Sequence, residues 1–306
     1  MPSPIPAGWV RLDRSKGARM KIGIGLPNPV PGTPGTRLVE WAKRAEERGF
    51  SGLATIDRVV YPSYDSLATL AAAAGATARI GLLTNVLLAP LYPAPLLAKT
   101  TASIDQLSNG RLTLGLAPGG RADDFEIVGK DFHTRGRDFD RDLETLHRAW
   151  RDERVDGNAK PICPTPIHES RVPILIGGTS DKAVRRVVDW AAGLTIGGAP
   201  PEHAAALVER VAAAWREAGR VGEPRFAALA YFSLGTDADD DSRRYLRDYY
   251  GFLGDYAEMI AEGALRSEAA IRGAVQAFGD AGVTELYFDP TTASLDQIDR
   301  LAEVVL

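Results

Sequence analysis

Several residue types and sequence features are scarce in this chain, and each scarcity removes a class of protein. The only cysteine in 306 residues is Cys163, so no disulfide framework exists and a reducing cytoplasm is the expected compartment. The four histidines are scattered without the spacing of a zinc site. The net charge is −4, so no overall basic field attracts nucleic acid or an anionic membrane. No apolar run is long enough to cross a bilayer.

Familiar catalytic motifs are also missing. The sequence contains no G-x-S-x-G turn of a serine hydrolase and no G-x-x-x-x-G-K-[ST] phosphate loop. The "GIG" near its start is not a full dinucleotide-binding fingerprint. None of the predicted strands ends in a lysine suited to Schiff-base chemistry. These absences argue against a serine hydrolase, a protein with a glycine-rich nucleotide-binding motif and a Schiff-base aldolase.

What is present is a regular alternation of strand-like and helix-like segments from Lys21 onward. The segment 36–50, for example, places apolar residues on one helical face and ends at Gly49. Eight strands, each followed by a helix, predict an α/β fold: a single (β/α)8 or TIM barrel with insertions. A doubly wound sheet would need fewer repeats or a second domain, and no linker marks a boundary. The predicted strands cover residues 21–26, 52–56, 80–85, 112–117, 173–178, 193–198, 226–234 and 285–290.

The chain divides into two unequal parts. Residues 1–19 are expected to be a disordered N-terminal extension, or to precede the native start of the protein. Residues 20–306 are expected to form the barrel domain. Within it, residues 151–172 are irregular and indicate an insertion. Residues 235–265 are helical and rich in aromatics, which fits either a lid or ordinary packing on the barrel wall.

Two Gly-Gly pairs follow the fifth and sixth predicted strands, and a helix begins after each. Glycine lets a phosphate approach the backbone, and a helix N-terminus offers free N–H groups. Tight strand-to-helix turns are the plain alternative. A barrel with such loops and few acid–base groups indicates that a cofactor carries the chemistry. The candidate phosphate-binding residues are Gly177, Gly178, Thr179, Ser180, Gly197 and Gly198.

The segment 79–137 resembles bacterial luciferase-like flavin-dependent oxidoreductases. It reads "RIGLLTNVLLAPLYPAPLLAKTTASIDQLSNGRLTLGLAPGGRADDFEIVGKDFHTRGR". The stretches "KIGIGLP", "PILIGGTS" and "GVTELYFDP" are similar to the same family. The resemblance spans nearly all of residues 20–306. It implies a TIM barrel that binds FMN, or the deazaflavin F420, at the carboxyl ends of its strands.

The resemblance also implies where the cofactor lies. In the family, a non-proline cis peptide at the end of the third strand lies beneath the flavin ring, and the matching bond here is Asn85–Val86. The plain alternative for Asn85 is a turn residue with its amide in water. The implied cofactor-binding residues, beside the two Gly-Gly turns, are Asn85, Val86, Gly115, Pro118 and Gly119.

The candidate catalytic residues are Asp57, Arg58 and Tyr61. The family commonly has an acidic residue and a histidine after the second strand, and this chain has Asp57-Arg58 instead. Asp57 is a candidate proton acceptor or the ion-pair partner of Arg58, and Tyr61 is a candidate to face the ring or the substrate. Asp124 stands where the family often has a carboxylate, although a solvated loop charge is the alternative.

The function expected from the resemblance is a two-component monooxygenase that uses reduced FMN and O2 on a small organic substrate. A separate flavin reductase is the expected partner. The first alternative is an F420-dependent dehydrogenase or reductase, whose long anionic cofactor tail needs basic residues such as Lys182, Arg185 and Arg186. Further alternatives are a flavin-binding protein without turnover and a phosphate-sugar enzyme. The resemblance and a small-residue-rich second helix also predict a homodimer, although packing of that helix against its own barrel is the plain alternative. The single cysteine, the net charge and the short apolar runs predict a cytoplasmic protein without nucleic-acid or membrane partners.

Overall fold

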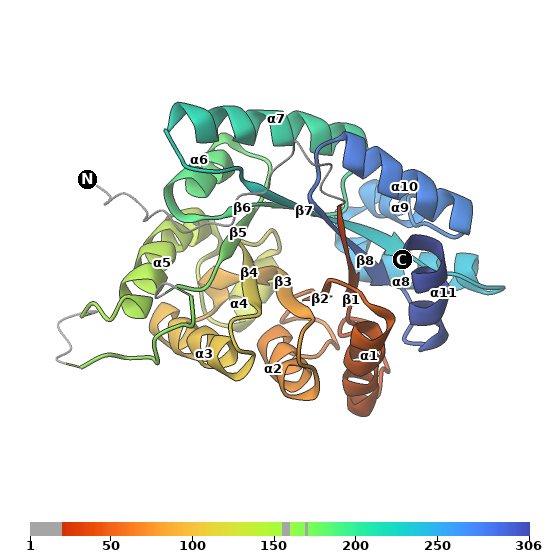
Figure 1. Ribbon diagram of the computed structural model, residues 1–306, viewed down its shortest axis with the longest axis horizontal. Coiled ribbons are helices and arrows are strands. Elements are labelled where there is room, and N and C mark those ends of the chain that lie inside the picture. The colour runs from red at the N-terminus through yellow and green to blue at the C-terminus, as the bar shows by residue number, and fades with distance from the viewer. Residues whose placement is uncertain (1–19, 155–159, 169–170) are drawn as a thin grey trace.

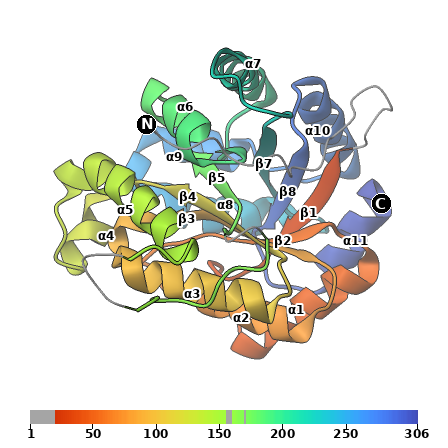
Figure 2. The ribbon, with the colours of Figure 1, turned by 60° about the vertical axis from the view of Figure 1, so that its left-hand side comes forward.

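The computed structural model describes residues 20–154, 160–168 and 171–306, so the predicted extension over 1–19 lies outside the described residues. Eight parallel strands close into a barrel in the order β1 to β8. Helices surround the strands (Figures 1 and 2). The predicted TIM barrel is therefore confirmed. The strands are β1 (Lys21–Gly25), β2 (Gly52–Thr55), β3 (Gly81–Leu88), β4 (Leu112–Ala117), β5 (Ile174–Gly177), β6 (Gly193–Ile196), β7 (Arg225–Phe232) and β8 (Glu285–Pro290).

The helices of the described chain follow the strands and cover the outside of the barrel. Their main members are α1 (Gly35–Arg48), α2 (Ser66–Ala76), α3 (Ala94–Leu107), α4 (Ala122–Ile127), α5 (Arg135–Trp150), α6 (Asp181–Trp190), α7 (Pro201–Glu217), α8 (Ala238–Tyr250), α9 (Asp255–Glu262), α10 (Glu268–Asp280) and α11 (Asp296–Val305). Short 3-10 turns are η2 (Ala89–Leu91), η3 (Phe132–Thr134) and η4 (Gly251–Leu253). None of the helices in the described ranges is both long and apolar enough to span a membrane.

Local sequence signals account for the ends and faces of these helices. In α1 the buried residues are Leu38, Trp41, Ala42 and Ala45, which recur with helical spacing. Gly49 ends α1 with φ +91°, a conformation that glycine adopts without strain. α2 begins at an Asp65 cap, whose carboxylate accepts a hydrogen bond from the backbone N–H of Ala68 at 2.6 Å.

Strand β3 departs from its prediction in a way that shapes the site. The sequence predicts that this strand ends at Asn85, but β3 continues to Leu88. Its pairing with β4 shifts between Thr84 and Leu87, so the chain bulges at Asn85 and Val86 before the ladder resumes. Pro90 and Pro93 follow only after the strand has ended, where a missing N–H is tolerated.

The barrel interior is filled by side chains at the amino ends of the strands. Arg225 begins β7 and donates to both carboxylate oxygens of Glu285, at 2.7 and 3.0 Å. Tyr287 is buried beside this ion pair, and a Cβ on Gly23 would come within 2.3 Å of its ring. Because side chains fill this end, a ligand inside the barrel is expected toward the carboxyl ends of the strands.

Candidate active site

A cavity of about 410 Å³ opens at the carboxyl ends of the strands. Its walls come from the loops after β2, β4, β5 and β6 and from the bulge of β3, and its roof comes from β7, α8 and η4. This volume is within the usual range of a small-molecule site. The active-site end of a TIM barrel is this same rim, so the cavity is the candidate active site.

The floor of the cavity is the bulge at Asn85 and Val86. The peptide bond between these residues is cis, as the resemblance implies. The Asn85 side chain is buried, and its Oδ1 accepts a hydrogen bond from the hydroxyl of Thr195. Its Nδ2 is also buried and has no hydrogen-bond partner. The expected cis bond is therefore present in the cavity lining, next to one donor without a partner in the protein.

The two Gly-Gly turns meet on the wall of this cavity. Gly177, Gly178, Gly197 and Gly198 all line it, and a Cβ added at either of the last two would meet no atom within 4 Å. Ser180 also lines the cavity and begins α6, where its hydroxyl accepts from the N–H of Ala183 at 3.3 Å. The turns thus form an open cradle beside a helix N-terminus.

Thr179 is the one residue of these turns that lies outside the cavity lining. It is exposed, and its carbonyl accepts a hydrogen bond from Arg210 at 3.1 Å. The residue that caps the following helix is Ser180, so Thr179 has a structural contact on the outer side of the turn.

Arg186 supplies a buried positive charge to the same wall. It lines the cavity, and its Nε lies 2.6 Å from Oδ1 of Asp140. Its Nη2 donates to the carbonyl of Gly136 at 2.9 Å. Lys182 and Arg185, which the sequence grouped with it, are exposed and do not line the cavity. The three basic residues therefore differ, and only Arg186 belongs to the site.

Asp57 is buried in the cavity wall and is held by two donors. Its carboxylate accepts from the N–H of Leu88 at 3.0 Å and from the hydroxyl of Tyr92 at 3.1 Å. Burial raises the pKa of this carboxyl to about 6, although both hydrogen bonds act in the opposite direction. Asp57 thereby fixes the backbone just beyond the bulge, and its carboxyl takes up a proton at a higher pH than an ordinary Asp does.

Arg58 pairs with Asp124 and not with Asp57. Its Nε lies 3.3 Å from Oδ2 of Asp124, which is fully buried. The other oxygen of Asp124 accepts from the N–H groups of Val59 and Val60 at 3.0 and 2.7 Å. The alternative of Asp124 as a solvated loop charge is therefore wrong. Arg58 lines the cavity, and its Nη1 is buried without a hydrogen-bond partner.

Tyr61 contacts the wall of the cavity and not the cavity itself. Its hydroxyl donates to Asp248 at 2.6 Å, and its ring meets that of Tyr249 edge-on at 5.0 Å. Tyr249 does line the cavity, so Tyr61 lies behind it. A direct catalytic role for Tyr61 stays a prediction, and the geometry indicates that it positions Tyr249.

The roof consists of aromatic side chains, most of them from the aromatic-rich segment 235–265. Tyr231 of β7, Tyr249 and Tyr250 of α8 and Phe252 of η4 all line the cavity. The hydroxyls of Tyr231 and Tyr250 share a hydrogen bond of 2.7 Å. Part of the segment 235–265 therefore covers the site, as the lid interpretation expects, and the aromatic surface suits a flat ring.

Of the remaining predicted residues, some line the cavity and one supports the backbone behind it. Pro118 and Gly119 line the cavity, whereas Gly115 does not. A Cβ on Gly115 would lie 2.1 Å from the carbonyl oxygen of Thr84, at the point where β3 bulges. Gly115 therefore makes room for the floor without reaching a ligand. No cluster of three or more metal-binding side chains occurs in the described ranges.

The raised pKa of Asp57 predicts a pH-dependent stability. An unfolded Asp releases its proton near pH 4, whereas Asp57 in the native state does so near pH 6. Between these values the native state binds more protons than the unfolded state, so its free energy of unfolding falls as pH rises. Asp57→Asn removes this loss. We therefore expect the difference in free energy of unfolding between Asp57→Asn and the unsubstituted protein to shift by about 3 kcal/mol in favour of the variant from pH 4 to pH 7.

The measurement is urea denaturation of both proteins across this pH range. Other buried carboxyls titrate in both proteins, so their effects cancel in the difference. Stability curves that run parallel from pH 4 to pH 7 would show that the pKa of Asp57 is not raised in the native state.

Comparisons with known proteins agree with this geometry. The model of the family described as luciferase-like monooxygenase matches residues 20–291. The 5,10-methylenetetrahydromethanopterin reductase of Methanolobus tindarius is 28% identical over 224 residues, 72% of this chain and 67% of that protein. Monooxygenase RslO1 from Streptomyces bottropensis has a similar structure, with a TM-score of 0.74, 20% identity and coverage of 93% of this chain and 97% of that chain.

An F420-dependent secondary alcohol dehydrogenase, solved with an F420-acetone adduct, is also similar in structure. Its TM-score is 0.77 at 18% identity, covering 94% of this chain and 98% of that chain. At this identity the likeness concerns the fold, whereas the family match spans most of the sequence. The chain therefore belongs to the luciferase-like monooxygenase family and is an oxidoreductase.

Proposed function

We propose that the protein binds a flavin-type cofactor with its ring over the Asn85–Val86 bond. The observation that carries this proposal is the buried Nδ2 of Asn85, a donor without a partner on the floor of an open cavity. A buried donor left without an acceptor costs free energy, so a ligand acceptor is expected there. The carbonyl and nitrogen edge of a flavin ring supplies such acceptors.

The cradle at the other wall fits the phosphate arm of the same cofactor. Gly197 and Gly198 leave space at the backbone, and α6 presents its N-terminus after Ser180. Arg186 adds a positive charge whose own partner, Asp140, is half exposed. An anion is stabilised by free N–H groups at a helix start and by a nearby guanidinium.

We further propose a monooxygenase as the leading activity. Bound reduced FMN supplies the two electrons with which O2 oxidises the substrate. The residues of this chain hold the ring and keep water from it. Tyr231, Tyr249, Tyr250 and Phe252 cover the cavity with aromatic surface, and Asp57 fixes the backbone after the floor through the N–H of Leu88.

The second candidate activity is hydride transfer with F420. The relative from Methanolobus tindarius, whose name denotes a reductase, favours it. The burial of Arg186 in the cavity wall favours it as well, because F420 carries more negative charge than FMN. A separate flavin reductase, a homodimer and a cytoplasmic location stay predictions of the sequence.

Anaerobic titration of the purified protein with reduced FMN and, separately, with F420 tests both activities. Binding of reduced FMN, followed on admission of air by reoxidation that is slower than that of free reduced FMN, supports the monooxygenase. Binding of F420 without binding of FMN supports the reductase. A protein that binds neither cofactor at micromolar concentrations contradicts the proposal as a whole.

A further inference from the structure

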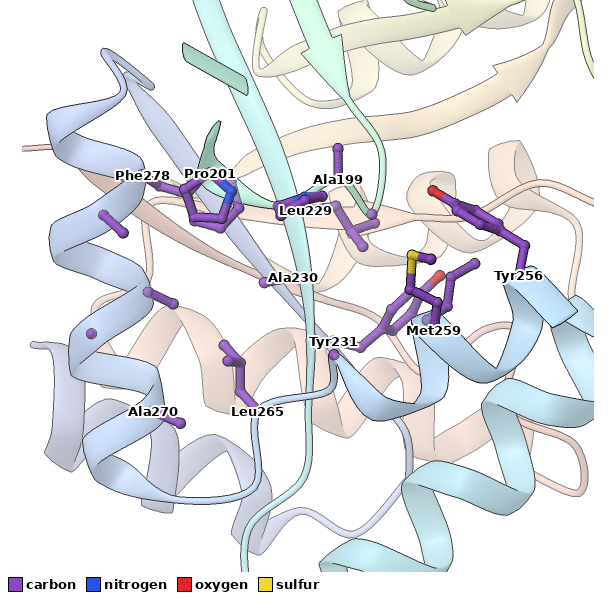
Figure 3. Close-up of a pocket in the computed structure, with 17 residues that line it drawn as sticks. Ala199, Pro201, Leu229, Ala230, Tyr231, Tyr256, Met259, Leu265, Ala270 and Phe278 are labelled. Atoms are coloured by element: carbon purple, nitrogen blue, oxygen red, sulfur yellow. The ribbon is translucent and has the colours of Figure 1, made fainter. Parts of the chain in front are cut away.

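A second cavity, of about 420 Å³, adjoins the first. Figure 3 shows β7 crossing it with Leu229, Ala230 and Tyr231, between Ala270 and Phe278 on one side and Tyr256 and Met259 on the other. We call it the side groove. Gly198, Leu229 and Tyr231 line both cavities. The two spaces therefore share one wall, directly beside the proposed place of the cofactor.

The barrel leaves this opening because two adjacent strands differ in length. β6 pairs with β7 only as far as the Ile196–Ala228 register, whereas β7 continues alongside β8 to Phe232. Above that register the edge of β7 faces the loop that enters α7, together with α9 and α10. These elements supply the rest of the groove lining. The groove is thus a gap in the barrel rim between two strands.

The lining of the side groove is mainly apolar. No charged side chain is among the described residues that line it. Leu265 and Phe278 form part of its wall, and α10 contributes Ala270, Gly273 and Ala274, whose small side chains keep the space open. Met259 is 63% exposed at its edge, so the groove also reaches solvent. Such a lining favours a hydrocarbon and disfavours an ion.

We propose that the side groove binds the uncharged hydrocarbon part of the substrate, whose reacting group then lies at the shared wall. This inference rests on the proposed function, because the shared wall is where the ring and the substrate would meet. The anionic tail of F420 is a poor occupant, since the groove offers no basic side chain. The substrate class is accordingly a neutral molecule with an alkyl chain or apolar ring.

Methyl ketones from butanone to nonanone serve as probes, with levulinate as an anionic analogue. Their dissociation constants are measured by ligand-detected NMR on the protein alone and on the cofactor-loaded protein. We expect affinity to rise about fourfold for each added methylene, the value for burying that group, and levulinate to bind most weakly. Affinity that does not change with chain length overturns the proposal.

A matched pair of variants places the binding in the groove. Gly273 and Gly279 both lie in α10, and a Cβ on either meets no atom within 4 Å, but only Gly273 lines the groove. Leucine also favours the helix over glycine at both positions, so folding is retained. We expect Gly273→Leu to abolish the chain-length dependence and Gly279→Leu to keep it. Equal behaviour of the two variants overturns the assignment.

The cofactor titration on the same variants separates the two proposals. Gly273 does not line the first cavity, so Gly273→Leu is expected to bind cofactor as the native protein does. Cofactor binding by the native protein, together with ketone affinities that do not depend on chain length, contradicts only the proposal for the side groove. Absence of cofactor binding in the native protein, with chain-length-dependent ketone binding retained in the cofactor-free native protein, contradicts the proposed function alone.

Discussion

Substitution of Gly115 by alanine is expected to lower the free energy of unfolding by about 3 kcal/mol. The bulge of β3 brings the carbonyl oxygen of Thr84 to 2.1 Å from the position that a Cβ on Gly115 would take. The hydroxyl of Thr84 also donates to the carbonyl of Gly115 at 2.9 Å, which ties the two strands together. Neither backbone can give way without moving the floor of the cavity. Urea denaturation measures the loss.

Gly120→Ala is the matched control for this change. Gly120 is exposed in the loop that follows the same strand, and a Cβ there would meet no atom within 4 Å. We expect its free energy of unfolding to change by about 0.5 kcal/mol or less. If Gly115→Ala is as stable as this control, β3 does not bulge against β4 as described.

Gly197→Leu is expected to weaken cofactor binding by about 100-fold, equivalent to about 2.7 kcal/mol. Gly197 lines the first cavity, and the space around its Cβ is open, so the leucine side chain would occupy the place of the phosphate. Each charge-assisted hydrogen bond lost there is worth about 1.5–3 kcal/mol. Anaerobic titration with reduced FMN and with F420 measures the affinity.

Gly279→Leu again provides the control, because it adds the same side chain outside both cavities. We expect it to bind cofactor as the native protein does. Thermal melting shows whether each variant remains folded. A folded Gly197→Leu protein with native affinity would mean that the anionic arm binds elsewhere.

The fold was largely predictable because strands that are buried on both faces are continuous apolar runs. The bounds predicted for β4 and β8 are those observed. The end of β3 was mispredicted because Asn85 is a polar residue within a strand, which local rules treat as a terminus. Its burial depends on the hydroxyl of Thr195, 110 residues away. No local pattern contains that contact.

Helix α10 was not predicted for a related reason. Its buried residues are only Ile271 and Phe278, so it lacks a strong apolar stripe. Its other inward positions are alanines and a glycine that border the side groove. These small residues weaken the apolar pattern of α10 in the sequence, and they also leave the space that forms the side groove.

Site residues that directly follow a strand could be predicted from the sequence, whereas those that reach the cavity from distant segments could not. The Gly-Gly turns and Asp57 follow strands directly, whereas Tyr249 reaches the cavity from a helix beyond β7. The sequence does contain a signal that distinguishes Arg186. It stands three residues after Ala183 and one before Val187, on the buried face of α6, which separates it from its exposed basic neighbours.

The side-chain amide of Asn85 offers the most direct test of the cofactor site. The chain has only four asparagines, so 15N labelling of asparagine gives few side-chain signals, and Asn85→Asp assigns the one of interest. On titration with reduced FMN or F420, we predict that the Asn85 Nδ2 signal shifts strongly. The chemical shift of the Asn28 side-chain amide should not change, because its Nδ2 already donates to the carbonyls of Ile56 and Tyr64. A cofactor that binds while the Asn85 signal remains unchanged would contradict the site described here.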